Sequence, residues 1–209
     1  MNKDLETVNK YLKREFLFIV VDSGDGSGKD TQTNLIARFY TMKGYKVRIR
    51  SHPSLDNPFG RLTKKALEEG GTKGHLKAAI FYIVDVIRSL VKYYRPSENE
   101  VLIISRYLLG VCYLPRSLVL FGYNFFSTFI PTSEFSFFLN VSPEVAWERI
   151  RKRGQKKEMF ESLARLRKMH EKMFYIAKLK GWMIINGNPP PKNVWLDIKK
   201  RLPLFKAIN

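Results

Sequence analysis

A glycine-rich stretch at residues 21–31, VDSGDGSGKDT, has residue types and spacing that could bind phosphate groups. It follows an apolar run, residues 16–21, long enough for a buried strand, and precedes an amphipathic run, residues 31–40, that predicts a helix. Backbone N–H groups of such a turn, the helix N-terminus and a lysine can together surround phosphates. The predicted phosphate-binding residues are Gly24, Asp25, Gly26, Ser27, Gly28, Lys29, Asp30 and Thr31.

Two positions of this loop depart from the usual pattern GxxxxGK[ST]. Ser23 stands in place of the first glycine, and Asp30 in place of the closing Ser or Thr. A carboxylate can bind Mg²⁺ directly but also repels phosphate, and Thr31 is a poor replacement because one helical step turns a side chain by about 100°. Asp30 is therefore the candidate Mg²⁺ ligand. The alternative is a glycine-rich turn that merely lies beside a surface lysine.

Length and composition predict one domain with a substantial core, residues 1–209. The single cysteine, Cys112, excludes an internal disulfide framework and is compatible with a reducing cytosol. Residues 1–15 are charged with apolar residues at helical spacing, which favours a lead-in helix over a signal peptide. Since no run reaches the roughly 18 apolar residues of a membrane span, we expect a soluble, cytoplasmic protein.

The net charge of +18 indicates partners of negative charge. Nucleotides and nucleic acids would both be attracted, so the charge alone does not separate them. The sequence has no RNP, zinc-finger or helix-turn-helix signature, and its three histidines lack zinc-ligand spacing. Nucleic acid is therefore not expected as a partner, and that alternative rests on charge alone.

Apolar strand-like runs alternate with helical patterns along the rest of the chain, as in a parallel sheet with helices on both faces. The sequence therefore predicts a three-layer α/β/α fold with a parallel five-stranded sheet. We expect strands at residues 16–21, 45–50, 101–104, 135–141 and 182–185, and helices at residues 31–40, 59–69, 76–94, 160–179 and 193–202.

Ligands of such sheets bind beyond the carboxyl ends of the strands. The long helix at residues 76–94 could cover this edge, together with a basic, mobile lid at about residues 149–160. The segments expected to meet there are residues 23–31, 50–57, 105–107 and 141–143.

Four stretches carry a family resemblance: GDGSGKDTQ (24–32), SRY (105–107), FLNVSPEVAWERIRKRG (138–154) and IINGNPPPKNV (184–194). Through them the chain resembles the thymidylate kinases, which are P-loop nucleoside monophosphate kinases, over most of its length after residue 15. The resemblance implies the P-loop nucleoside triphosphate hydrolase fold and phosphorylation of a nucleoside monophosphate, normally dTMP to dTDP. It also implies ATP as the phosphoryl donor, Mg²⁺ as cofactor and a homodimer.

The resemblance places cations around the transferring phosphoryl group, where positioning and charge neutralisation carry the reaction. Asp25 matches a loop carboxylate that orients an arginine near the acceptor. Some relatives carry an arginine next to that carboxylate, whereas this chain has Gly26, so the lid must supply the cation. The alternative for the lid arginines is a solvated helix face. The implied catalytic residues are Lys29, Arg106, Arg149, Arg151 and Arg153, with Lys156 and Lys157 behind them.

On the acceptor side, Phe81 matches an aromatic residue that stacks on the base, although it could equally be a core residue. Asp85 stands where the family has a base-reading arginine, and Arg88, one turn on, is the candidate replacement. Ser51 stands at the place of a phosphate-binding arginine. The implied acceptor residues are Asp25, Arg50, His52, Phe81, Asp85, Arg88 and Arg106.

The family's metal-associated aspartate is Ser105 in this chain. Together with Asp30, this substitution suggests that a carboxylate has moved across the Mg²⁺ site from one segment to the other. Two alternatives to a dTMP kinase stay open. Asp85 and Ser51 favour a kinase for a different nucleoside monophosphate, whereas Ser23, Asp30 and Ser105 favour a nucleotide-binding homologue with impaired catalysis.

Overall fold

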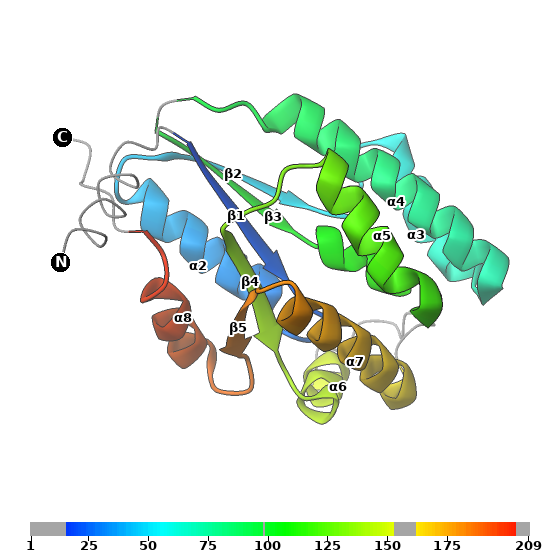
Figure 1. Ribbon diagram of the computed structural model, residues 1–209. Coiled ribbons are helices and arrows are strands. Elements are labelled where there is room, and N and C mark those ends of the chain that lie inside the picture. The colour runs from blue at the N-terminus through cyan, green and yellow to red at the C-terminus, as the bar shows by residue number, and fades with distance from the viewer. Residues whose placement is uncertain (1–15, 98, 153–161, 204–209) are drawn as a thin grey trace.

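The computed structural model describes residues 16–97, 99–152 and 162–203 (Figure 1). Its five strands form one parallel sheet in the order β2-β3-β1-β4-β5, which confirms the predicted fold class. In chain order the elements are β1 (Phe16–Asp22), α2 (Lys29–Thr41), β2 (Lys46–Ser51), α3 (Pro58–Glu69), α4 (Gly71–Tyr93), β3 (Glu100–Ser105), the 3-10 helix η1 (Leu108–Tyr113), α5 (Arg116–Phe129), β4 (Phe135–Asn140), α6 (Pro143–Lys152), α7 (Leu163–Leu179), β5 (Met183–Asn186) and α8 (Pro191–Lys199).

Both faces of the sheet are covered, which explains why β1 is continuously apolar. Leu17, Ile19 and Val21 point to the face packed with residues of α2 and α8. Phe18 and Val20 point to the opposite face, which packs with residues of α4, η1, α5 and α7 (Figure 1). Two buried clusters therefore hold the sheet, and its carboxyl edge is left for the site.

Several predicted boundaries need correction. α4 begins at Gly71 rather than residue 76, directly after the positive-φ residue Gly70 that ends α3. The prediction that a mobile loop begins at Arg149 is wrong, because α6 continues through Lys152 before any glycine interrupts it. The rest of the expected lid, residues 153–161, and the expected lead-in helix lie outside the described residues. No described helix is long and apolar enough to cross a membrane.

Candidate active site at the carboxyl edge of the sheet

The phosphate-binding loop runs from the end of β1 to the first turn of α2. Gly28 caps this helix with φ of 83°, a left-handed conformation that glycine adopts without strain. Gly26 also has a positive φ, 74°, and a Cβ atom there would collide with the backbone carbonyl of Ala146 in α6. The loop therefore packs so closely on α6 that no side chain fits at Gly26. This contact explains why an arginine beside Asp25 has no room in this chain.

The departure at Ser23 also has a structural reason. Its hydroxyl donates to the backbone carbonyl of Leu139 in β4 at 2.6 Å, and the side chain is buried. The neighbouring Asp22, which is 1% exposed, accepts hydrogen bonds from the backbone N–H groups of Ser23, Tyr107 and Leu109. Burial raises the pKa of Asp22 although these hydrogen bonds oppose the shift. These two side chains tie the start of the loop to β4 and to the segment after β3.

Lys29, Asp25 and Arg106 form one charged group. Lys29 is 3% exposed, and its Nζ donates to the carbonyl of Gly24 at 3.1 Å and lies 3.5 Å from Asp25 Oδ1. The same Oδ1 accepts a hydrogen bond from Arg106 Nη2 at 2.7 Å. Two cations from different parts of the chain therefore share one carboxylate at the end of the sheet, as the sequence predicts for Asp25 and Arg106.

The charges of this group follow from their proximity. Burial alone would raise the pKa of Asp25, but Lys29 and then Arg106 outweigh burial and hold this pKa far below its ordinary value. Burial lowers the pKa of Arg106, whereas Asp25 raises it more, so the guanidinium stays charged. Burial and the nearby Arg106 lower the pKa of Lys29 against the attraction of Asp25. An anion bound here would complete the neutralisation of the second cation.

Arg106 has φ of 55°, which is uncommon for a residue other than glycine. The hydroxyl of Tyr82, on α4, is shared between the carbonyls of Arg106 at 2.6 Å and Tyr107 at 2.9 Å. Residues in sparsely populated conformations persist where their surroundings hold them, and they gather at functional sites. Tyr82 is thus a clamp on the backbone that presents the Arg106 guanidinium to the loop.

A cavity of about 210 Å³ opens beside this charged group. Asp25 and Arg106 lie at its wall, and Gly110 of η1 contributes a surface without a side chain. A Cβ atom at Gly110 would collide with the Tyr82 ring, so the glycine makes room for that aromatic side chain. The wall from the loop after β2, from α3 and from α4 includes Pro53, Leu55, Thr63, Leu67, Ala78 and Tyr82.

The structure corrects the aromatic assignment on the acceptor side. Tyr82 lines the cavity, whereas Phe81 does not lie in its wall. Adjacent helical residues differ by about 100° in direction, so only one of the two can face the cavity directly. Tyr82 was missed because the resemblance directs attention to Phe81. Asp22 was missed too, although a single charge that ends an apolar strand directly before a glycine loop was a usable signal.

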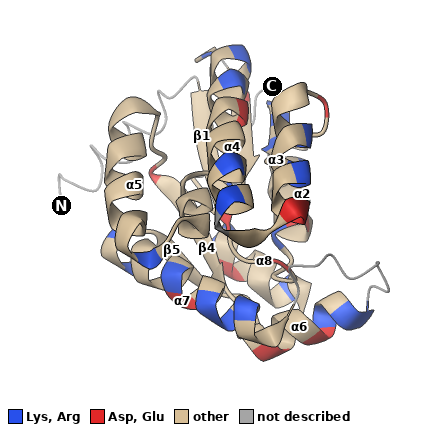
Figure 2. Ribbon diagram, turned by 90° about the vertical axis from the view of Figure 1, so that its right-hand side faces the viewer, with Lys and Arg blue, Asp and Glu red and all other residues tan. Residues whose placement is uncertain are grey.

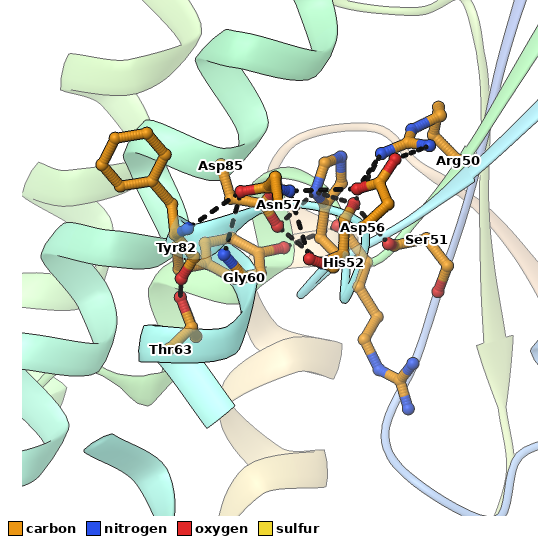
Figure 3. Close-up of polar contacts among 12 residues, drawn as sticks. Arg50, Ser51, His52, Asp56, Asn57, Gly60, Thr63, Tyr82 and Asp85 are labelled. Carbon is orange, nitrogen blue, oxygen red and sulfur yellow. Dashed lines mark hydrogen bonds and ion pairs between the residues drawn. The ribbon is translucent and has the colours of Figure 1, made fainter. Parts of the chain in front are cut away.

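The predicted contacts of His52 and Asp85 with the acceptor are also wrong. Both side chains are 0% exposed, and His52 Nδ1 lies 3.0 Å from Asp85 Oδ2 (Figure 3). A completely buried side chain offers no atom to a ligand in this structure. The sequence could not show this inward direction, because polar residues on a long helix usually face solvent.

The two arginines predicted on the acceptor side are also directed elsewhere. Arg50 makes an ion pair with Asp56 at 3.0 Å, and its guanidinium stacks over the ring of Tyr93 at 4.6 Å. Arg88 is half-buried, and its Nη1 has no hydrogen-bond partner among the described residues. Neither residue lines the cavity. Their predicted contacts with the acceptor are therefore not formed in this arrangement.

Of the predicted lid arginines, Arg149 is the one that reaches the loop. Its guanidinium donates to the carbonyls of Ser27 at 3.4 Å, Gly187 at 3.0 Å and Asn188 at 2.9 Å. Arg149 thus joins the phosphate-binding loop to the segment after β5. Arg151 is exposed on α6, and Lys and Arg residues continue along α6 and α7 (Figure 2). The predictions for Arg153, Lys156 and Lys157 fall outside the described residues.

Asp30 is exposed in the first turn of α2 and lies close enough to affect the pKa of Lys29. Among the described residues, no group of three or more His, Cys, Asp or Glu side chains gathers to hold a metal ion. Mg²⁺ needs no such cage, because it commonly takes one or two carboxylates together with water and substrate phosphates. The exposed carboxylate of Asp30 therefore fits this manner of binding, whereas Ser105 is buried at the end of β3.

Known proteins resemble this chain in both sequence and structure. A family model described as thymidylate kinase matches residues 21–198. The probable thymidylate kinase of Pyrobaculum aerophilum is 30% identical over 201 residues, which cover 90% of this chain and 99% of that protein. The probable thymidylate kinase of Thermococcus kodakarensis is 29% identical over 175 residues, covering 78% and 85%.

Two solved structures support the fold. A thymidylate kinase from Candida albicans has a TM-score of 0.67 at 15% identity, covering 90% of this chain and 92% of that chain. A deoxyadenosine kinase from M. mycoides with bound dATP has a TM-score of 0.66 at 17% identity, covering 88% and 98%. The structural likeness shows the fold, and the sequence matches show the family. This chain, with its phosphate-binding loop facing a cavity through Asp25 and Arg106, belongs to the thymidylate kinase family.

Proposed function

We propose that the protein transfers the γ-phosphoryl group of ATP to a nucleoside monophosphate, with dTMP as the acceptor. The observation that carries the proposal is the shared carboxylate of Asp25. It joins Lys29, in the donor-phosphate loop, to Arg106, at the wall of a cavity on the other side. The reaction needs such a meeting point, because the two substrates must bring their phosphates together.

In the proposed reaction, an oxygen of the acceptor phosphate attacks the γ-phosphorus of ATP. The bond from that phosphorus to the bridging oxygen breaks, which leaves ADP and a nucleoside diphosphate. Lys29 and the N–H groups of the loop hold the donor phosphates, and Arg106 neutralises charge at the transferring group. Arg149 keeps the loop in place, while Arg151 and Arg153 are the candidates for a further cation. Bound Mg²⁺ would neutralise the donor phosphate oxygens, with Asp30 as its protein ligand.

A coupled assay of ADP release with ATP, Mg²⁺ and a panel of nucleoside monophosphates tests the proposal. We expect turnover with dTMP. ATP binding without turnover of any acceptor would instead indicate a nucleotide-binding homologue with impaired catalysis. Salt-sensitive binding to oligonucleotides that nucleotides do not affect would favour a nucleic-acid-binding protein.

A second candidate is a kinase of the same fold for a different nucleoside monophosphate. The observation that favours it is the burial of Asp85, which stands where the family resemblance places a base-reading arginine. The cavity wall holds no arginine besides Arg106, which pairs with Asp25 at the phosphate end. The same panel decides, since turnover with another acceptor and not with dTMP supports this second candidate.

Asp30→Ala is expected to weaken the Mg²⁺ dependence of ATP binding and turnover. If Asp30 is the single protein ligand, the variant needs about tenfold more Mg²⁺ for half-maximal activity. Thermal unfolding with ATP and increasing Mg²⁺ gives a readout independent of turnover. Asp197→Asn, which removes an exposed carboxylate paired with Arg201 on α8, is the control. An unchanged Mg²⁺ requirement in Asp30→Ala would show that the carboxylate has not moved to the loop.

We also propose a homodimer that forms through α4 and α5, as the family resemblance implies. The two helices border an apolar groove whose wall includes Ile83 and Ile87 of α4 and Phe126 of α5. The exposed apolar residues on these helices are Leu76, Ile80, Ile87, Val91, Leu118, Phe121, Phe125 and Phe129. Contiguous apolar surface of this kind is rare on monomers and is typical of subunit contacts.

Phe125→Glu is expected to convert the dimer to a monomer, because a carboxylate at the centre of an apolar contact would be buried unpaired. Size-exclusion chromatography with light scattering measures the change in mass. The control is Leu196→Glu on α8, where the replaced residue is 47% exposed, compared with 48% for Phe125. A wild-type protein of monomer mass, or a Phe125→Glu variant that stays dimeric, would contradict this interface.

A further inference from the structure

A completely buried carboxylate lies behind the cavity, at a position where the family resemblance leads one to expect contact with the acceptor. Asp85, on α4, accepts hydrogen bonds from His52 Nδ1 at 3.0 Å, from Ser54 N–H at 2.7 Å and from Asn57 Nδ2 at 2.7 Å (Figure 3). We call these four residues the Asp85 cluster. A carboxylate without water is costly unless its lone pairs are satisfied, and here both oxygens are occupied.

The charge state of the cluster follows from these bonds. Burial would raise the pKa of Asp85, but the hydrogen bonds from His52, Ser54 and Asn57 lower it on balance. The ionised carboxylate can only accept, so His52 Nδ1 must carry a proton. The imidazole is 0% exposed and packs edge-to-face against the Tyr82 ring, with 6.2 Å between centroids. His52 thus connects the carboxylate to an aromatic wall of the cavity.

Asn57 extends the cluster to α3. Its Nδ2 donates to Asp85, while its Oδ1 accepts from the N–H groups of Phe59 and Gly60 and caps the helix. A Cβ atom at Gly60 would collide with the backbone of Ser54, so the loop lies directly on the first turn of α3. The loop and the helix can therefore hardly shift relative to one another while Asp85 holds both.

All three parts that the cluster holds contribute to the cavity wall. The loop after β2 contributes Pro53 and Leu55, α3 contributes Thr63, and α4 contributes Tyr82. The donor side depends on other contacts, namely Lys29 with its loop and the Arg149 bonds. Disturbing the cluster should therefore change one substrate site and leave the other intact.

We propose that Asp85 and His52 are positioning residues that set the shape of the acceptor cavity by joining the loop after β2, α3 and α4. This inference rests on the proposed function. Neither residue contacts the acceptor, and both act through Pro53, Thr63 and Tyr82. The carboxylate at position 85 thus serves to shape the pocket rather than to read the base.

Asp85→Asn tests this proposal at nearly constant side-chain volume. The amide puts a donor against at least one of the donors now facing the carboxylate, so the loop must move. We expect the KM for the acceptor to rise about tenfold or more, with the KM for ATP within about twofold of wild type. We also expect weaker discrimination among nucleoside monophosphates, which a uniform loss of stability would not produce. The matched control is Asp56→Asn, a carboxylate of the same loop that is 47% exposed and pairs with Arg50.

A pair of variants at position 52 provides a second, independent measurement. His52→Asn keeps an N–H donor near the place of Nδ1, whereas His52→Leu has a similar volume and no donor. The asparagine variant should retain acceptor affinity better than the leucine variant. This pair leaves the carboxylate in place, so it carries the test if Asp85→Asn fails to fold, as judged by circular dichroism.

The possible failures are distinguishable. A wild-type protein that turns over no monophosphate contradicts the proposed function and this inference together. An active wild type whose acceptor KM is unchanged in Asp85→Asn overturns the inference alone. Equal increases in both KM values, or an equal effect of Asp56→Asn, would reduce the Asp85 cluster to a general structural role.

Discussion

Arg106→Leu is expected to lower kcat by about 10³-fold, the largest effect of any single substitution in this protein. Arginines that neutralise charge on a transferring phosphoryl group contribute 10³- to 10⁵-fold in related chemistry. Arg106 is held for this role by Asp25 at 2.7 Å and by the Tyr82 clamp on its own carbonyl. Steady-state kinetics with ATP and the preferred monophosphate measure the loss.

Arg106→Lys separates charge from geometry. Lysine keeps the positive charge but lacks the planar fork that can bind a carboxylate and a phosphate together, so we expect only partial recovery. Asp25→Asn should weaken turnover through the same contact, and the double variant should lose less than the sum of the two single losses. Additive losses would show that Asp25 and Arg106 act separately.

The Asp25–Arg106 pair should not introduce a pH dependence near neutrality. The pKa of Asp25 is lowered from its ordinary 3.8 and that of Arg106 is raised, so both stay charged across that range. A carboxylate with a lowered folded-state pKa stabilises the protein above its unfolded value and loses this contribution as the pH falls below it. Acid unfolding of Asp25→Asn should therefore show a smaller pH dependence below about pH 4 than wild type.

Lys29→Met is expected to lower kcat/KM by about 10²- to 10³-fold, comparable to the loss of a preorganised donor in other active sites. Methionine replaces the stem of the lysine closely but removes the buried cation that the donor phosphates would meet. Lys29 is 3% exposed, and its ammonium is held at the loop by the Gly24 carbonyl. Turnover and ATP binding, the latter measured by calorimetry, should both weaken.

The matched control for this variant is Lys178→Met, which changes an exposed lysine in the last turn of α7. It should leave both quantities unchanged. Circular dichroism must show that Lys29→Met is folded, since the loop packs tightly against α6 through Gly26. Wild-type turnover in a folded Lys29→Met variant would remove the loop from the proposed mechanism.

The sequence by itself determined the parts of this protein that depend on local pattern. Continuous apolar runs predicted a parallel sheet buried on both faces, and the structure confirms it. The glycine turn between β1 and α2 was predictable because its glycines, its lysine and the helix that follows are adjacent in sequence. The meeting of Asp25 and Arg106 was also predictable, since parallel strands end at one edge.

Only the tertiary structure decided which side chains of the long helix and the following loops face the cavity. Tyr82 rather than Phe81 lines it, Asp85 turns inward to His52, and Arg50 pairs with Asp56. Periodicity shows that a helix has an apolar face, but the rotation of α4 is set by its packing on α3, η1 and the sheet. One residue of rotation, about 100°, separates a residue that contacts substrate from one that supports the pocket. That choice depends on contacts between residues far apart in sequence, which no local pattern contains.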